Sequence, residues 1–204
     1  MVSRCDVHIL ISPGRQQWLS QCLASLDREP AMIRIRRGTP GHIGIGRASA
    51  YAEGSAPFVA RVDDDDYIEP GALATCVALL DANPNASAAT TDLAIVDRSE
   101  RITGHTRIRD RSVAAIARSP ATVHHLTVYR RAAVEPWLDE IAAWPYWDDW
   151  ILAAGVATWG PVLSVPMMGY YWRRHRTRAE TMALFQPQRE SYRAAARRVR
   201  EILR

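Results

Sequence analysis

The first third of the chain alternates short apolar segments with segments whose apolar residues recur at helical spacing. Strand-like patterns occur at 7–11, 33–35 and 57–62, and helical patterns follow them at 18–26, 47–54 and 70–80. A short apolar run or a period of two residues favours a strand, and a period of 3.6 residues favours a helix. This repeated order predicts an α/β fold with a mostly parallel central sheet flanked by helices.

The pattern changes in the second half of the chain. Shorter strands are predicted at 88–96 and 102–108, around a turn at Thr103-Gly104, and a further strand is predicted at 122–129. Short strands that follow one another closely are typical of antiparallel pairing. We therefore expect a short antiparallel portion in this half of the sheet.

The composition is that of a globular protein. Of 204 residues, 48% are hydrophobic and 24% are charged, a balance that argues against a disordered chain. Three widely separated cysteines indicate neither a disulfide framework nor a zinc cluster. No apolar run approaches the roughly 20 residues that span a bilayer, and the N-terminus lacks a secretory-signal pattern. We therefore expect a cytoplasmic protein without a transmembrane segment.

Positive charge is concentrated at the C-terminus. The formal net charge is +4, and residues 173–204 alone contain ten Arg and three Glu. In the predicted closing helix, 191–204, and just before it, arginines recur every three or four residues, at Arg189, Arg193, Arg197, Arg200 and Arg204. These residues form one stripe, and an apolar stripe of the same helix would pack on the protein. We expect residues 1–180 to form a catalytic domain and residues 181–204 to form a basic amphipathic helix packed on it.

Two interpretations of the basic stripe stay open. A row of charges is usually a solvated helix face. The alternative is a surface for an anionic partner or acceptor, such as nucleic acid (for instance a hydroxylated base in DNA), an acidic lipid surface, a protein or a glycan.

Four consecutive aspartates, Asp63 to Asp66, follow the third predicted strand. Adjacent carboxylates repel one another, and a divalent cation relieves the repulsion. In an open α/β sheet, ligands bind at the carboxyl ends of strands. If strand geometry continues to Asp66, Asp63 and Asp65 project to one side and could bind Mg²⁺ or Mn²⁺ beside the phosphates of a nucleotide. The alternative is a solvated acidic loop that caps the helix expected to begin at Pro70.

The residues around this cluster resemble family 2 glycosyltransferases. The similar segments are Gly44-Ile45-Gly46-Arg47-Ala48, Tyr51-Ala52-Glu53-Gly54, Phe58 to Asp66, and Glu69-Pro70. The resemblance implies a GT-A fold, a nucleotide-diphosphate sugar donor and a divalent metal, Mn²⁺ or Mg²⁺. It also implies that Asp63 contacts the nucleoside or sugar of the donor and that Asp65 is a metal ligand. Arg47 and Asp64 would lie at the donor.

A second segment, Trp147-Asp148-Asp149-Trp150-Ile151-Leu152, resembles the Glu-Asp-Trp-x-Leu motif of the same family and lies in a predicted helix, 146–157. The resemblance implies that Asp149 is the general base and that Asp148 supports it. A sugar hydroxyl is a poor nucleophile unless its proton is removed as it attacks the anomeric carbon. The alternative is that the tryptophans belong to the core and the aspartates cap the helix.

A third segment, Tyr171-Trp172-Arg173-Arg174-His175, resembles the family's Tyr-Arg-x-His motif. The resemblance makes His175 a candidate metal ligand and Arg173 a candidate contact to the donor phosphates, because a guanidinium matches phosphate geometry. The adjacent pair His124 and His125 is interpreted as structural.

Two departures from the family pattern concern the donor. The first strand ends in Ser12-Pro13-Gly14-Arg15 rather than Pro-Thr-Tyr-Asn, and Arg36-Arg37-Gly38 stands where the family has an acidic motif that reads the nucleobase. The identity of the base is therefore left open. We expect a metal-dependent, inverting glycosyltransferase that moves a hexose or a pentose to a hydroxyl acceptor. The alternative is a non-catalytic GT-A-like module, or a nucleic-acid-binding protein whose aspartates are structural.

Overall fold

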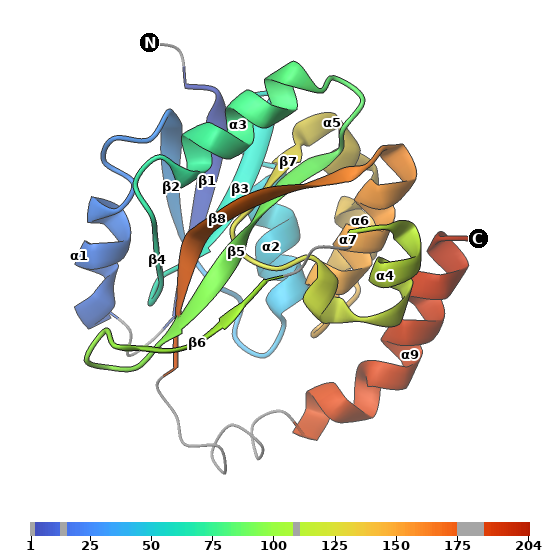
Figure 1. Cartoon of the computed structure of the whole chain (residues 1–204). Coiled ribbons are helices and arrows are strands. Elements are labelled where there is room, and N and C mark those ends of the chain that lie inside the picture. Colours follow the sequence, from blue (N-terminus) through green and yellow to red (C-terminus); the bar gives the residue numbers. More distant parts are fainter. Residues whose placement is uncertain (1–2, 13–15, 108–110, 175–185) are drawn as a thin grey trace.

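In the computed structural model, which describes residues 3–12, 16–107, 111–174 and 186–204, helices cover both faces of one sheet (Figure 1). The strands are β1 (Cys5–Ile11), β2 (Ala31–Arg37), β3 (Phe58–Asp63), β4 (Tyr67–Ile68), β5 (Ala88–Val96), β6 (Ile102–Thr106), β7 (Thr127–Arg130) and β8 (Val162–Arg173). Their order is β2-β1-β3-β7-β5-β8-β4, with β6 beside β5.

The sheet is mixed. Strands β2, β1 and β3 run parallel, β7 is antiparallel to both of its neighbours, and β8 returns parallel to β5. The short strands β6 and β4 pair antiparallel with β5 and β8. The predicted class, an α/β GT-A-like fold with antiparallel pairing in the second half, is confirmed, but the sheet is mixed rather than mostly parallel because β7 runs antiparallel between β3 and β5.

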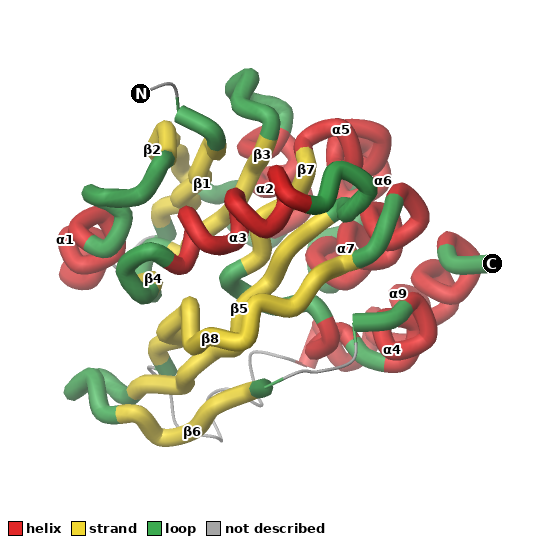
Figure 2. Tube along the Cα trace, turned by 45° about the horizontal axis from the view of Figure 1, so that its top comes forward, coloured by secondary structure: helices red, strands yellow, loops and turns green. Residues whose placement is uncertain are grey.

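Helices form a layer on each side of this sheet (Figure 2). They are α1 (Gln16–Ala24), α2 (Ile43–Tyr51), α3 (Ala72–Ala82), α4 (Val113–Arg118), α5 (Arg131–Val134), α6 (Leu138–Ala142), α7 (Asp148–Trp159) and α9 (Gln186–Ile202). Helices α1 and α3 share one hydrophobic core with the strands, and α2, α4 to α7 and α9 share the other.

Alternate residues of the inner strands supply the two cores, because successive side chains of a strand point to opposite faces. Val7 and Ile9 of β1 belong to the core under α1 and α3, and Val59 of β3 belongs to the core under α2 and α7. Burying one such aliphatic side chain contributes roughly 1.5–3 kcal/mol. The cores therefore fix the carboxyl ends of β1 and β3 relative to α2 and α7.

Strand β1 also carries a buried histidine. His8 is 1% exposed, and its ring meets Tyr51 edge to face. Within the described residues, neither ring nitrogen has a hydrogen-bond partner. Burial lowers the pKa of His8 to about 4, although Asp6 opposes the shift. The histidine is therefore held neutral inside the fold.

The turn expected at Thr103-Gly104 is wrong. Both residues lie within β6, and the chain reverses instead between Asp97 and Arg101. The Asp97 carboxylate accepts hydrogen bonds from the N–H groups of Ser99 and Arg101, which stabilises the turn at that point. Gly104 is compatible with a strand because its backbone is not left-handed, and even a Cβ atom there would only be in ordinary contact with Ile95, at 3.4 Å.

The strand expected at 122–129 is shorter than predicted. A 3-10 turn, Pro120–Thr122, comes first, and only Thr127–Arg130 pairs in the sheet. Two strands, β4 and β8, had no counterpart in the sequence analysis. Strand β8, 12 residues long, matters for the site because it pairs with β5 and ends at Arg173, beside the aspartates.

The helix expected to begin at Pro70 begins at Ala72, after a left-handed Gly71 (φ 83°). Helix α9 is amphipathic, as predicted. Its Ala195, Ala196 and Val199 are buried against α7, and all five stripe arginines are exposed. The proposed boundary between residues 180 and 181 lies outside the described residues and stays a prediction. None of the described helices is long and apolar enough to cross a membrane.

Candidate functional site

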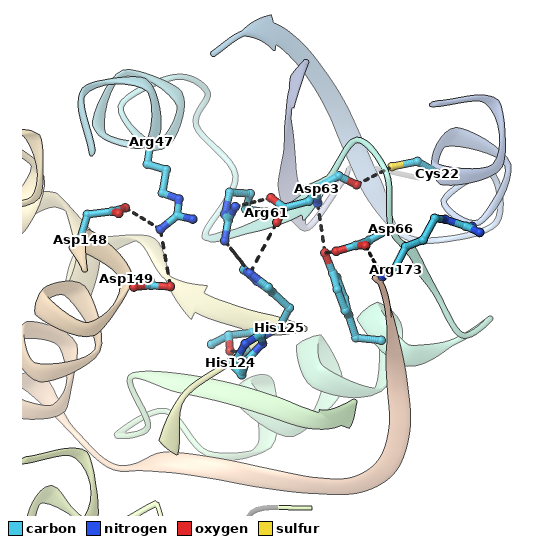
Figure 3. A network of polar contacts seen from close by, with 12 residues as sticks. Cys22, Arg47, Arg61, Asp63, Asp66, His124, His125, Asp148, Asp149 and Arg173 are labelled. Carbon is cyan, nitrogen blue, oxygen red and sulfur yellow. Dashed lines mark hydrogen bonds and ion pairs between the residues drawn. The ribbon is translucent and has the colours of Figure 1, made fainter. Parts of the chain in front are cut away.

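The first half of the candidate site is the aspartate turn at the end of β3 (Figure 3). Asp63 is the last residue of the strand, and the N–H of Asp66 donates to the Asp63 carbonyl over 3.1 Å. The condition for Asp63 and Asp65 to project to one side, strand geometry that continues to Asp66, is therefore not met. The Asp63 side chain is 29% exposed, whereas Asp64, Asp65 and Asp66 are buried.

Two buried aspartates of this turn hold neighbouring backbone in place. Asp64 accepts a hydrogen bond from the N–H of Ser12, just after β1. Asp66 accepts from the Tyr170 hydroxyl (2.8 Å) and from the N–H of Arg173 (2.7 Å), both on β8. Burial and the nearby carboxylates raise the pKa of Asp66 well above its usual range. These contacts tie the ends of β1, β3 and β8 together and leave the Asp63 side chain at the surface.

Arg173 supports the turn from the side of β8. Its side chain is 1% exposed, and its Nε donates to the Asp65 carbonyl over 2.9 Å. A second nitrogen donates to Gln21, and the guanidinium lies over the rings of Trp18 and Tyr67. Nη1 has no hydrogen-bond partner among the described residues. The predicted contact between Arg173 and a donor phosphate stays a prediction.

A buried arginine and a histidine surround Asp63. Arg61, on the same strand, contacts the Asp63 carboxylate through Nη1, and its Nη2 lies 2.6 Å from Nε2 of His125. That His125 nitrogen is 3.8 Å from the Asp63 carboxylate. Burial and the Arg61 charge lower the pKa of His125 well below its usual value. The arrangement fixes the Asp63 side chain from two directions.

The second half of the site is the N-terminus of α7. Trp147 precedes the helix with a left-handed backbone (φ 65°), and its indole N–H donates to the Gln188 carbonyl of α9 over 2.7 Å. The two aspartates that follow differ in exposure: 2% for the Asp148 side chain and 48% for that of Asp149. Left-handed residues other than glycine are uncommon and are often found at functional sites.

Arg47 of α2 joins the two aspartates. Its Nη1 donates to the Asp148 carboxylate at 2.7 Å and lies 3.6 Å from that of Asp149. Burial raises the pKa of Asp148, and the Arg47 charge opposes the shift. Helix α2 can lie close to α6, the helix that precedes α7, because Gly44 packs on the backbone of Ile141, where a Cβ atom would collide.

The two halves face each other, with Arg47 and Arg61 between Asp149 and Asp63 in Figure 3. Burial and Arg61 act to lower the pKa of Arg47, but Asp148, Asp149 and Asp63 together raise it. Residues from three separate sequence motifs therefore meet in one electrostatic network. It holds two accessible carboxylates beside two largely buried guanidinium groups.

Of the two metal ligands predicted from the sequence, Asp65 and His175, only Asp65 is among the described residues. His175 lies outside the described residues. Asp65 is described and is 5% exposed. Within the described residues, no three His, Cys, Asp or Glu side chains converge as a metal site would require. The described residues therefore supply one predicted ligand and not a complete set.

Three contributors to the network had not been assigned to the site from the sequence: Arg61, His125 and Tyr170. The sequence does contain a signal for Arg61, because a charged residue inside an otherwise apolar strand needs a buried partner. His125 and Tyr170 reach the site through β7 and β8, whose pairing the sequence did not reveal. Their proximity to Asp63 depends on the sheet order alone.

Neither a protein-family model nor a curated protein matches the sequence. Solved structures of TarS from S. aureus share its fold. The complex of TarS residues 1–349 with UDP-GlcNAc has a TM-score of 0.66 at 15% identity, covering 87% of this chain and 60% of that one. The complex with UDP has a TM-score of 0.64 at 14% identity, covering 84% and 60%. The chain thus spans 60% of the length of these structures, and the likeness is one of fold.

Proposed function

We propose that the protein transfers a sugar from a nucleotide-diphosphate sugar to a hydroxyl acceptor, as the resemblance to family 2 glycosyltransferases implies. The observation that carries the proposal is the accessible Asp149 carboxylate, held beside the Arg47–Asp148 ion pair and facing Asp63. The fold supports a nucleotide-sugar donor, because TarS with the same fold binds UDP-GlcNAc.

Asp149 acts as the general base in this proposal. Its carboxylate is half-exposed and can approach an acceptor hydroxyl, whereas Asp148 is buried and engaged with Arg47. Asp149 takes the hydroxyl proton while the acceptor oxygen attacks the anomeric carbon and the bond to the diphosphate breaks. Attack from the side opposite the diphosphate inverts the anomeric configuration.

The donor lies toward the end of β3. Asp63 contacts the nucleoside or sugar, and Arg47 is placed to neutralise charge that develops on the leaving diphosphate. Asp64 and Arg173 contribute by holding the backbone of the aspartate turn, since both side chains are buried. Arg61 positions Asp63 through their ion pair.

A divalent cation, Mn²⁺ or Mg²⁺, is part of the proposal. Asp65 and His175 would hold it, and it would supply charge neutralisation for the diphosphate. The proton transfer to Asp149 and the positioning of Asp63 are properties of the chain itself and do not pass through the metal.

Thermal unfolding with a panel of nucleotide-diphosphate sugars tests the proposal, with and without Mn²⁺. A ligand at 100 times its Kd that binds only the folded state stabilises it by about 2.7 kcal/mol. We expect one nucleotide class to raise the melting temperature of the parent protein. Asp65→Asn should lose the Mn²⁺-dependent part of that rise and keep the melting temperature of the free protein.

Release of the nucleoside diphosphate in the presence of hydroxyl acceptors distinguishes an enzyme from a binding module. Stabilisation by a sugar nucleotide without any such release would favour a non-catalytic GT-A-like module. If no sugar nucleotide stabilises the protein and none is consumed, the proposed function is wrong. Equal Mn²⁺-dependent shifts in the parent and in Asp65→Asn would remove Asp65 as a metal ligand.

A further inference from the structure

Helix α9 presents a row of exposed positive charge. Its exposed arginines are Arg189, Arg193, Arg197 and Arg200, and Arg204 follows just beyond the end of the helix; none of the five forms an ion pair with a described residue. At 100° per residue, the four helical side chains fall within an arc of about 80°, and at 1.5 Å per residue they span about 16 Å. Like charges spaced four residues apart on a helix repel one another. A bound anion would relieve that repulsion.

Another arginine of the same helix shows how a structural arginine behaves here. Arg198 lies outside the row and is paired with Glu140 at 2.9 Å and with Glu201 at 3.4 Å. Glu140 also accepts a hydrogen bond from the Trp144 indole, so the pair fastens α9 to α6. The row therefore contrasts with an arginine that has a packing role in the same helix.

The row begins beside the proposed catalytic segment. The indole of Trp147, directly before the two aspartates of α7, donates to the Gln188 carbonyl, next to Arg189. One turn along α9, Tyr192 stacks on Trp150 and meets Trp147 edge to face, yet 36% of it is exposed. A polymer that follows the row would thus arrive near Asp149, with an aromatic ring at the point of arrival.

We propose that this face of α9 binds a nucleic-acid strand, which presents the hydroxyl acceptor to Asp149. The part of this inference that concerns the reaction rests on the proposed function, and the part that concerns the partner rests on the row of arginines. Guanidinium groups match phosphate oxygens in charge and geometry. The helical part of the row, about 16 Å long, corresponds to about five nucleotides of a strand with the 3.4 Å spacing that a duplex has. Rows of positive charge with an adjacent aromatic ring are typical of nucleic-acid strand binding.

The packing of α9 disfavours a membrane as the partner. A helix that enters a lipid surface needs a free apolar face. The apolar side of α9 is already occupied, because Ala195, Ala196 and Val199 are buried in the core shared with α7. Only the charged side remains available, and it suits a partner bound through phosphate contacts.

Fluorescence anisotropy of a labelled single-stranded oligonucleotide tests the inference, with no sugar nucleotide present. Each phosphate contact contributes about −0.7 to the slope of log K against log salt for a single strand. Five contacts predict a slope of about −3.5, and changing Arg193, Arg197 and Arg200 to Gln should bring it to about −1.4. The matched control changes three exposed arginines elsewhere, Arg28, Arg98 and Arg107, to Gln, and should keep the parent slope.

Two results would overturn the inference: equal slopes for the α9 variant and the parent protein, or equally strong competition by inorganic polyphosphate, which has no bases. Nucleoside-diphosphate release with a small hydroxyl acceptor is measured in parallel. If release continues while oligonucleotide binding is absent, the partner is wrong and the proposed function stands. If binding follows the prediction but no sugar nucleotide is consumed, the nucleic-acid surface stands and the transferase proposal fails.

Discussion

Two segments bring adjacent aspartates to the site, and the protein holds them by different means. At the end of β3, backbone N–H groups and a tyrosine hydroxyl bind Asp64 and Asp66. At the start of α7, a guanidinium from another helix binds Asp148. In both segments one carboxylate stays accessible, with 29% exposure at Asp63 and 48% at Asp149.

The difference lies in what each accessible carboxylate can do. Asp63 is ion-paired with a buried arginine and lies beside His125, so its orientation is fixed. Asp149 has a looser contact, 3.6 Å from Arg47, and keeps a face toward solvent. A fixed carboxylate suits recognition of a donor, and an exposed one that a hydroxyl can reach suits removal of a proton. The chemistry of an aspartate in an acidic cluster is therefore defined by the groups that contact it, and not by its position in the cluster.

The largest effect on stability is expected at the buried aspartate of α7. Removing one member of a buried ion pair typically costs about 3–5 kcal/mol. We expect Asp148→Ala to lower the free energy of unfolding by this amount, because Arg47 stays buried without its closest partner. Asp149→Ala should change it by less than about 1 kcal/mol, as is usual for an exposed position. Urea unfolding of both variants measures the contrast, and equal losses would erase the distinction between the two aspartates.

A smaller effect concerns His8, which tests whether the interior behind the site excludes charge. The pKa of His8 is lowered to about 4, against about 6.5 in an unfolded chain. As the pH falls below 6.5 the unfolded state takes up a proton first, so the folded state loses stability, up to about 3 kcal/mol near pH 4. Urea unfolding of the parent and His8→Phe between pH 7 and about pH 4 should show a flatter dependence in the variant. Parallel curves would mean that His8 is not held neutral.

The smallest of these effects is expected at Asp63. Replacing it with Asn keeps the side-chain shape and removes the charge that interacts with Arg61 and, in the proposed function, with the donor. We expect the Kd for the sugar nucleotide to rise about tenfold, equivalent to about 1.4 kcal/mol, even at saturating Mn²⁺. Calorimetric titration measures the change. An unaltered Kd would move the donor contact to another residue of the turn.

Much of the first half of the fold could be predicted from the sequence, because local patterns determine it. Apolar runs of β1 and β3 and the helical spacing of α3 are visible in the chain itself. The second half could not be predicted as well. Pro166 and Gly169 interrupt the pattern of β8, and its register with β5 shifts around Asp92. A strand that forms mainly because it pairs with a neighbour shows only a weak strand pattern in its own residues.

The candidate site also has features that could be predicted from the sequence and features that could not. The motifs around Asp63 and Asp149 were visible in the sequence, but their state of burial was not. Alternation along a strand suggested that Asp65 points the same way as Asp63, and the turn at Asp63 removed that periodicity. Arg61 and His125 come together because β3 pairs with β7. Such contacts depend on sheet order, which no single segment encodes.

Sugar transfer by Asp149→Asn, compared with the parent protein, tests the central claim most directly. The substitution preserves shape and removes the basic oxygen, and a general base typically contributes about 10²–10⁴-fold to the rate. We predict that the initial rate of transfer falls by this factor while the Kd for the sugar nucleotide, measured on the same preparations, stays at the parent value. Transfer at the parent rate, or a loss confined to donor binding, would contradict the assignment of Asp149 as the base.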